Sequence, residues 1–347
     1  MATLREIMGG ANRQVMMDLG VQQPLDNSPL LATGAIVTDA AISAQVRAGL
    51  RKIDAYYVSN IDTSLESNYG NTVYTDIAQP RGISGGTTQA RVSFQNEAFL
   101  ESSLERMLIG QSPLTLMKTM IDNYWTKQFE HRAVATMFGI RNFVMNSAAG
   151  IKDQFVINNS KTTGADAASG FSIDQFIDVE ATLDPSMRGA GAIVVHPKIA
   201  AKMRKQTILE KLVTSDNAPA VEVYNGRTVI EVNSPMTVIG TGTNAQYISY
   251  LVGAGAFVGD SVVGNDDLEV DRTAATGNGA GHTALWTRRN ILIHPQGFNF
   301  IATDEQLTGG TKNEALSASW DDLTNKDYWT LGTDAARTSI RFLVTNL

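Results

Sequence analysis

The chain has 347 residues, of which 43% are hydrophobic and 18% charged, so a buried core is expected and wholesale disorder is excluded. The net charge of -7 argues against a dedicated nucleic-acid binder, but it allows a protein that encloses nucleic acid without binding it tightly. Cysteine is absent, which rules out disulfides, thiol catalysis and Cys-ligated metals. We recognise neither a secretory signal in residues 1–20 nor an apolar run of the ~18–20 residues that a membrane span needs.

The first hundred residues predict extended structure. Residues 1–52 combine short helical patches with prolines and lack a steady period, which is typical of an arm without its own core. Residues 53–100 read as a long hairpin, with limbs at 53–58 and 88–94 and many turn-forming residues between them. A connecting loop of about 30 residues is too long for a compact protein unless it has a function.

The most regular pattern in the chain is a long helix over residues 112–143. A short amphipathic helix is predicted before it, over 100–109, ending at the C-cap glycine Gly110. Ser112 can then cap the long helix, and Pro113 stands at its first position. Apolar residues recur mostly at three- and four-residue steps: Leu114, Met117, Met120, Ile121, Tyr124, Trp125, Val134, Met137 and Phe138. The helix would span roughly 45 Å, more than a compact domain needs.

The second half of the chain alternates helices with strands. Helices are predicted over 172–183, with Ser172 as cap, and 197–205; strands are predicted over 192–195, 228–232, 247–252 and 338–344. A second long hairpin has limbs at 268–271 and 287–294 around the Gly/Ala/Asn-rich tip 274–281. The terminal strand is expected to join a sheet formed from earlier strands.

Two stretches resemble catalytic loops. Residues 82–86 match G-x-S-x-G around Ser84, but that motif needs a strand before it and a helix after it, so we interpret it as a loop tip. Residues 253–259 resemble a dinucleotide loop. Their third glycine comes one residue too late and no helix follows, which favours a tight connection between strands.

No metal site or catalytic group of residues is predicted. The four histidines lack metal-ligand spacing. We interpret His196 and His294 as half-buried residues at strand ends whose hydrogen-bonding groups are satisfied. The acidic pairs Asp266–Asp267 and Asp321–Asp322 lack the spacing of a calcium loop and read as solvated turns. One basic cluster reads as a solvated helix face: Lys202, Arg204, Lys205 and Lys211. We therefore expect no enzyme activity and no cofactor. The arm and hairpins bury little surface in their own subunit, which predicts an obligate oligomer.

This order of parts resembles the major capsid protein of a tailed bacteriophage, with the Hong Kong 97-type α+β shell fold. The most family-like stretches are 257–260 and 286–298. The resemblance implies an N-terminal arm (1–52), an extended loop (53–100), a peripheral domain with the spine helix (101–157), an axial domain (158–261), peripheral strands with a protruding loop (262–303) and a return to the axial domain (304–347).

The resemblance also implies a function. Pentamers and hexamers would tile an icosahedral head around double-stranded DNA, without sequence-specific binding or a membrane, in a virion assembled in the host cytoplasm and fitted with a portal. Axial domains would meet at the capsomer centre, and the extended loop would lie across a neighbour. The expected inter-subunit contacts are Tyr56, Tyr57, Arg81, Arg91, Phe94, Arg272, His282, Arg288 and Arg289.

This sequence differs from some members of the family in two ways, and each difference leads to a prediction. Residues 53–100 contain no lysine, and Lys52 lies at the base, so we expect no isopeptide cross-link and reliance on non-covalent contacts or a cement protein. The region before the loop is short, so we expect a separate scaffolding protein. A slightly acidic lining would let packaged DNA slide. The alternatives are an encapsulin-like nanocompartment shell and, more distantly, a soluble enzyme using Ser84.

Overall fold

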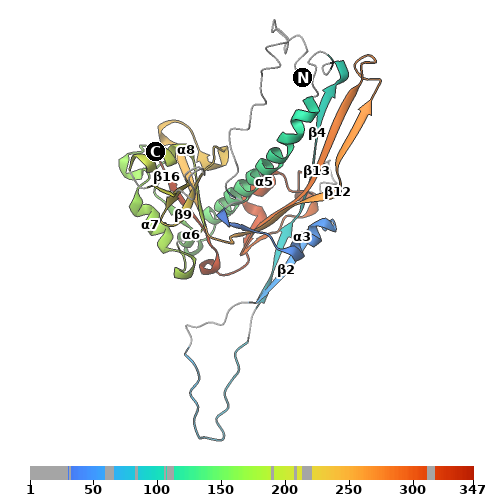
Figure 1. Cartoon of the computed structure of the whole chain (residues 1–347). Coiled ribbons are helices and arrows are strands. Elements are labelled where there is room, and N and C mark those ends of the chain that lie inside the picture. The colour runs from blue at the N-terminus through green and yellow to red at the C-terminus, as the bar shows by residue number, and fades with distance from the viewer. Residues whose placement is uncertain are drawn as a thin grey trace.

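The computed structural model of the chain describes residues 30, 33–58, 66–82, 85–104, 107, 113–188, 191–206, 209–212, 221–310 and 317–347. Their α+β fold combines a long helix with a four-stranded sheet and an eight-stranded sheet (Figure 1). Most of the predicted N-terminal arm and the cap Ser112 lie outside the described residues. None of the helices that the structure describes is long and apolar enough to cross a membrane.

The predicted long helix is confirmed as α5 (Pro113–Met145), with 33 residues. Its buried side chains follow the helical period: Ile121, Trp125, Phe129, Ala133, Met137, Ile140 and Val144. These residues belong to one core cluster that also contains side chains from both sheets. The helix therefore joins the two sheets through one continuous core.

The four-stranded sheet, called here the long sheet, runs beside α5 in the order β1-β12-β13-β4. Its strands are β1 (Ile36–Val37), β12 (Phe257–Thr273), β13 (His282–Pro295) and β4 (Ser93–Ser102). The predicted second hairpin is thus confirmed, but its strands are longer than expected and contain a bulge between Val263 and Leu268. Trp125 Nε1 donates to Thr287 Oγ1 at 3.1 Å, which ties α5 to this sheet.

The eight-stranded sheet forms a separate body, called here the eight-stranded body, with order β5-β16-β11-β6-β9-β8-β7 and β10 paired to β11. Its strands are β5 (Val156–Asn158), β6 (Ala192–Val195), β7 (Glu210–Leu212), β8 (Val221–Tyr224), β9 (Arg227–Glu231), β10 (Val238–Ile239), β11 (Gln246–Val252) and β16 (Ile340–Thr345). The C-terminal strand β16 lies between β5 and β11, so the last residues complete a sheet begun by earlier strands.

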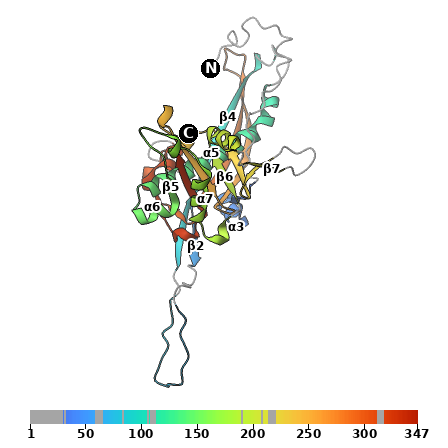
Figure 2. The same cartoon turned by 90° about the vertical axis from the view of Figure 1, so that its left-hand side faces the viewer.

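Helices cover both faces of this sheet (Figure 2). One face packs against α5 and α6 (Ala149–Phe155), and the other against α7 (Ile173–Ala181) and α8 (Pro197–Lys205). The predicted cap is confirmed, because Ser172 accepts a hydrogen bond from the Gln175 backbone N–H. The tight connection predicted within 253–259 is also confirmed: residues 253–256 join β11 to β12, and residues 257–259 already belong to β12.

A third unit projects from the long sheet. Strands β2 (Lys52–Val58) and β3 (Gly85–Arg91) form the predicted hairpin, which points away from both sheets (Figure 1). Helix α3 (Ala40–Arg47) covers its root, where Val46, Ile53, Val92 and Leu292 form a small core. After β14 (Phe298–Phe300), the chain returns through α9 (Trp320–Thr324) and β15 (Trp329–Leu331), which pairs with β14, before entering β16.

Two local predictions are wrong. Residues 100–102 continue strand β4 and do not begin a helix, because Leu100 pairs with Ala284 of β13 and the strand ladder outweighs local helix propensity. Residues 93–94 likewise belong to β4 and not to the hairpin limb, which ends at Arg91. In the remainder of the predicted helix, residues 103, 104 and 107 are helical as predicted, and the other residues of 103–109 lie outside the described part.

Candidate inter-subunit surfaces

The root of the β2–β3 hairpin is held by a cluster of opposite charges. The Asp304 carboxylate forms ion pairs with Arg91, Arg51 and Lys52, the last two at 3.8 and 3.9 Å. The hydrogen bond from Arg91 is the main reason that the pKa of Asp304 lies below its usual value. Because these cations belong to both limbs of the hairpin, Asp304 fixes the direction in which the hairpin leaves the body.

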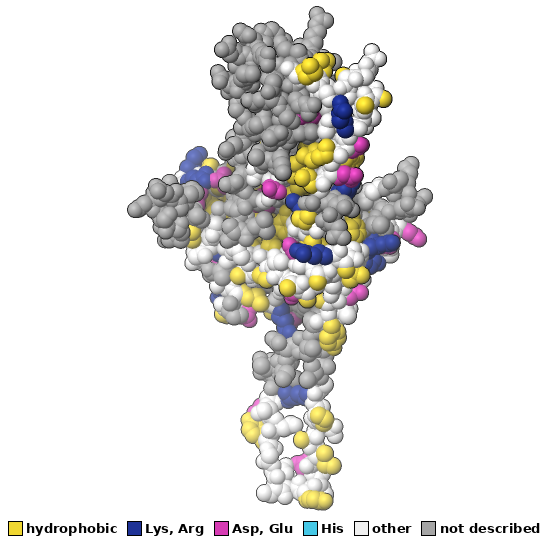
Figure 3. All heavy atoms as spheres, turned by 45° about the vertical axis from the view of Figure 1, so that its right-hand side comes forward, with side chains coloured by type: hydrophobic (Ala, Val, Ile, Leu, Met, Phe, Trp, Pro, Cys, Tyr) yellow, Lys and Arg dark blue, Asp and Glu magenta, His cyan; other side chains and the backbone are white. Residues whose placement is uncertain are grey.

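The loop at the end of this hairpin exposes apolar side chains. Tyr74 is fully exposed and Ile77 is 79% exposed, and Tyr69 and Val73 are also exposed. Figure 3 shows these hydrophobic atoms along an extension that stands clear of the body. Hydrogen bonds within this loop are local, such as the one that Tyr69 Oη donates to Glu66 Oε1 at 2.6 Å. Exposed apolar residues in such number on one projection indicate a contact surface.

The second hairpin ends in an ordered turn. His282 Nδ1 lies 2.7 Å from Thr276 Oγ1, and the Gly281 N–H donates to the Thr276 carbonyl at 2.9 Å. Gly277 and Gly281 have φ of 64° and 79°, the left-handed region that glycine enters without strain. Arg272 is exposed beside this turn. Val270, which is 64% exposed on the outer strand β12, adds an apolar contact point.

Two arginines of β13 form ion pairs on opposite faces of the long sheet. Arg288 binds Glu269 at 2.8 Å, and Arg289 binds Asp122 of α5 at 3.5 Å. Arg288 is about 39% exposed and Arg289 about 15%. Arg288 is therefore the more accessible of the two for a neighbouring chain.

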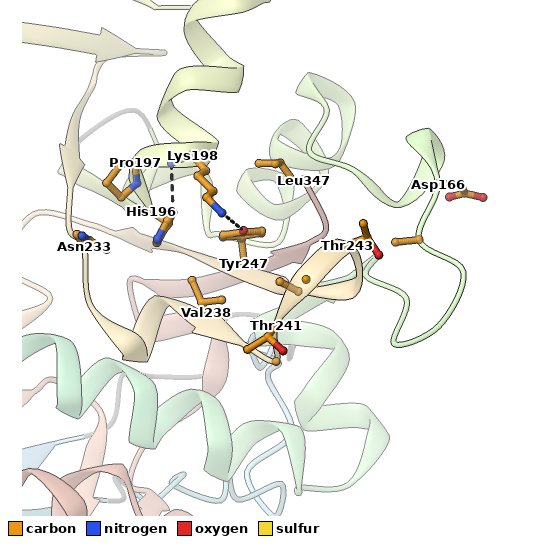
Figure 4. Close-up of a pocket in the computed structure, with 14 residues that line it drawn as sticks. Asp166, His196, Pro197, Lys198, Asn233, Val238, Thr241, Thr243, Tyr247 and Leu347 are labelled. Carbon is orange, nitrogen blue, oxygen red and sulfur yellow. Dashed lines mark hydrogen bonds between the residues drawn. The ribbon is translucent and has the colours of Figure 1, made fainter.

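The eight-stranded body contains an open cavity of about 1060 Å³ at the end where the parallel strands β6 and β9 finish. Figure 4 shows His196, Lys198 and Tyr247 gathered along one wall. Lys198 Nζ donates to Tyr247 Oη at 3.3 Å, and His196 Nδ1 accepts from the Lys198 backbone N–H at 3.1 Å. Burial, with the nearby Lys198 charge, lowers the pKa of His196. This neutral ring caps α8.

A catalytic or metal-binding arrangement is not found within the described ranges. No group of three or more metal-ligating side chains occurs there. Asp322, predicted in a solvated turn, is buried and completes a capping box with Ser319 at the start of α9. Asp266 and Asp267 have no described side chains, and Ser84 lies outside the described residues.

The predicted half-buried, satisfied state of His294 is wrong. Its ring is buried and has a backbone hydrogen bond with Phe298, but its Nε2 has no hydrogen-bond partner among the described residues, and burial lowers its pKa to about 4. The basic helix face is only partly solvated, because Arg204 binds both Glu222 and Glu231. The Lys211 side chain is not described.

The structure separates the predicted contact residues into accessible and internal ones. Tyr56, Arg81 and Arg272 are exposed, while Phe94, His282, Arg288 and Arg289 are partly exposed; the side chain of Tyr57 lies outside the described part. Arg91 does not fit a contact with a neighbour. It is only 6% exposed, and its guanidinium binds Asp304 of the same chain.

The sequence did not indicate which residues form ion pairs with the predicted contact residues. Asp304 is distant in sequence from the hairpin, and no local pattern marks it. The buried pair Glu180–Arg227, 3.2 Å apart, was also missed. A charged residue within an apolar helix face, such as Glu180 beside Val179, is the signal that could have indicated a buried partner.

Comparison with solved structures identifies the fold. The whole chain aligns with a subunit of the cyanophage Pam1 capsid asymmetric unit, with a TM-score of 0.51, 7% identity, and coverage of 100% of this chain and 99% of that one. The fold is therefore that of a phage capsid subunit of the Hong Kong 97-like type.

Further solved structures are similar at lower scores. The head of Helicobacter pylori bacteriophage KHP40 aligns with a TM-score of 0.49 and 10% identity over 97% of both chains. The capsid of the empty GTA particle aligns with a TM-score of 0.48 and 12% identity, over 95% of this chain and 94% of that one. No protein-family model and no curated protein matches the chain.

Proposed function

We propose that this chain is the structural subunit of an icosahedral viral head, which self-assembles as pentamers and hexamers and encloses double-stranded DNA. The observation that carries the proposal is the projecting β2–β3 hairpin, whose loop exposes Tyr69, Val73, Tyr74 and Ile77 away from its own subunit. Exposed side chains of this kind are stabilised only when another copy covers them. The full-length match of the fold to a phage capsid subunit supports the same function.

The proposed role is structural and not enzymatic. The long sheet and α5 supply rigidity, and the arm and extended loop bind several neighbours at once, so that weak contacts add up to a stable shell. The eight-stranded body would be the axial domain at the capsomer centre, and the long sheet with α5 the peripheral domain. The exposed Tyr56, Arg81, Arg272, His282 and Arg288 would contact neighbouring subunits.

The proposed partners are other copies of this chain, a portal, a separate scaffolding protein and a cement protein. DNA would be enclosed without sequence-specific contacts, in a virion assembled in the host cytoplasm. Because residues 53–100 contain no lysine, the shell would be non-covalent, and a denaturing gel of assembled particles should show one band at the monomer position. A covalent ladder would overturn this point.

The test is negative-stain electron microscopy beside size-exclusion chromatography of the full chain. We expect closed particles, rings, or five- and six-fold capsomers. The variant Tyr74→Ser/Ile77→Ser should weaken assembly while leaving the monomer folded, because both side chains are exposed. The matched control is Gln128→Ser on α5, away from the loop. A clean monomer or dimer across salt and pH would refute the proposal.

The encapsulin-like alternative shares the fold but is not favoured, because the structure that the whole chain matches is a phage capsid. DNA protected from nuclease in particles isolated from infected cells would support the viral head. Particles that contain a protein cargo and no DNA would support the nanocompartment.

A further inference from the structure

Helix α8 carries a row of lysines on its outer face. Ile199, Ala200 and Met203 are buried in the core of the eight-stranded body. Lys198, Lys202 and Lys205 follow at the i, i+4, i+7 spacing of a single helix face. Within the described residues, none of these three lysines has a carboxylate partner, whereas the adjacent Arg204 has two. We call this row the lysine face.

Helix α7 carries the complementary surface. Its buried side is formed by Phe176, Val179 and Glu180. On its outer side Ile173 and Ile177 are exposed, the latter by 52%, and the exposed Asp174 and Asp178 stand beside them. Neither aspartate has a cationic partner in the described part of the chain. We call this surface the acidic face; it combines two unpaired negative charges with two exposed isoleucines.

The lysines lie in an environment where a carboxylate would be favourable. Lys202 is partly desolvated, and burial lowers its pKa. Lys198 also lines the open cavity, whose walls include the apolar side chains Pro197, Val238 and Ala245 (Figure 4). The lysine face therefore offers unpaired cations next to an apolar hollow.

The charges of the two helices favour a contact between unlike faces of different copies. Both pack on the same side of the eight-stranded sheet, with α8 above α7 in Figure 1. Two lysine faces would repel each other, and so would two acidic faces, so a symmetric contact of like with like is disfavoured. A contact between unlike faces is heterologous when the two faces of one copy meet two different neighbours, and it then generates a ring if its rotation closes, whereas a two-fold contact would pair both faces between the same two copies.

We propose that the acidic face of one copy docks on the lysine face and adjoining cavity of the next copy, forming the ring contact of the capsomer. Asp174 and Asp178 supply the carboxylates that Lys198 and Lys202 lack, and Ile173 and Ile177 cover the apolar hollow. This inference rests on the proposed shell function and names the surface through which its rings close.

The test is a charge exchange in the full chain. We would compare Lys198→Glu/Lys202→Glu, Asp174→Lys/Asp178→Lys and the variant with all four changes. The measured quantity is the concentration of free subunit that coexists with assembled particles at about 0.1 M salt, where exposed charges still interact over roughly 10 Å. The control, Asp153→Lys on α6, reverses an exposed charge that has no ion pair within the described part of the chain and lies outside both faces.

Each double variant should raise the free-subunit concentration at least about tenfold, because like charges then face each other across the contact. The four-fold variant should return it to within about threefold of the original, since the pairs are restored with reversed sign. The control should leave it unchanged. This recovery excludes misfolding as the cause of the loss, because a misfolded chain would not be repaired by further charge reversals.

Three outcomes would overturn the inference. Double variants that assemble normally would show that this contact is absent, while shell formation by the original chain would still uphold the proposed function. A four-fold variant that fails although its thermal unfolding matches that of the original would also refute the pairing. Normal assembly with loss of enclosed DNA in the lysine variant alone would assign the lysine face to nucleic acid. Failure of the original chain to assemble would instead refute the shell function itself.

Discussion

Gly139, in the interior of α5, lies where the helix passes closest to the returning C-terminal segment. A Cβ atom added here would lie 1.9 Å from the Leu323 carbonyl oxygen and 2.7 Å from Trp329 Nε1. Those two groups form a buried hydrogen bond with each other, at 2.8 Å. Gly139→Ala therefore forces α9 and the Trp329 indole away from α5.

Two destabilising effects and one stabilising effect determine the change in the free energy of unfolding. Overpacking of a well-filled site costs about 1–3 kcal/mol. Disturbing a buried hydrogen bond costs about 1–3 kcal/mol more. Replacement of glycine by alanine in a helix interior returns about 1 kcal/mol through propensity. We expect Gly139→Ala to lower the free energy of unfolding by about 1–5 kcal/mol.

The assay is urea unfolding of the full chain, followed by tryptophan fluorescence, with thermal unfolding as a second probe. Trp329 reports directly on the altered site because it is buried against α5. The matched control is Gly150→Ala in α6, where the added Cβ would meet no heavy atom within 4 Å. The control should be neutral or stabilising by up to about 1 kcal/mol. A Gly139→Ala protein as stable as this control would refute the close approach of α5 and α9.

Three further predictions concern charged or titrating groups. Asp304→Asn should leave the body folded but speed amide hydrogen exchange in β2 and β3, since both limbs lose their shared anion; unchanged exchange would contradict the role of Asp304. Glu180→Gln should lower the free energy of unfolding by about 3–5 kcal/mol in a denaturant titration, because Arg227 stays buried without its counter-charge, whereas a loss below about 1 kcal/mol would argue against the pair. Burial lowers the pKa of His294 to about 4 in the folded chain, whereas the unfolded chain keeps the ordinary value of about 6.5. As the pH falls from about 6.5 to 4, the unfolded chain therefore binds a proton that the folded chain does not. The folded state should lose about 3 kcal/mol over that window, measured as unfolding free energy against pH, and His294→Leu should flatten the profile, while an unchanged slope would refute the assignment.

Local patterns in the sequence predicted many of the elements. The apolar period with Pro113 located α5, Ser172 located the start of α7, and the run 192–195 located the buried strand β6. These signals succeed because helix period, capping and strand burial depend on residues within a few positions of one another. Clusters of turn formers likewise located both hairpins, since a chain reversal is a local event.

The tertiary structure decided what those elements contact. Residues 100–102 are a strand because β13 lies beside them, and Arg91 is internal because Asp304, more than 200 positions away, binds it. Such outcomes depend on which distant segments share a core, and no local window contains that information. The sequence by itself thus determined the helices, the hairpins and the absence of thiol chemistry. Only the folded chain decided which charges are paired within the subunit and which, on α7 and α8, have no ion-pair partner among the described residues.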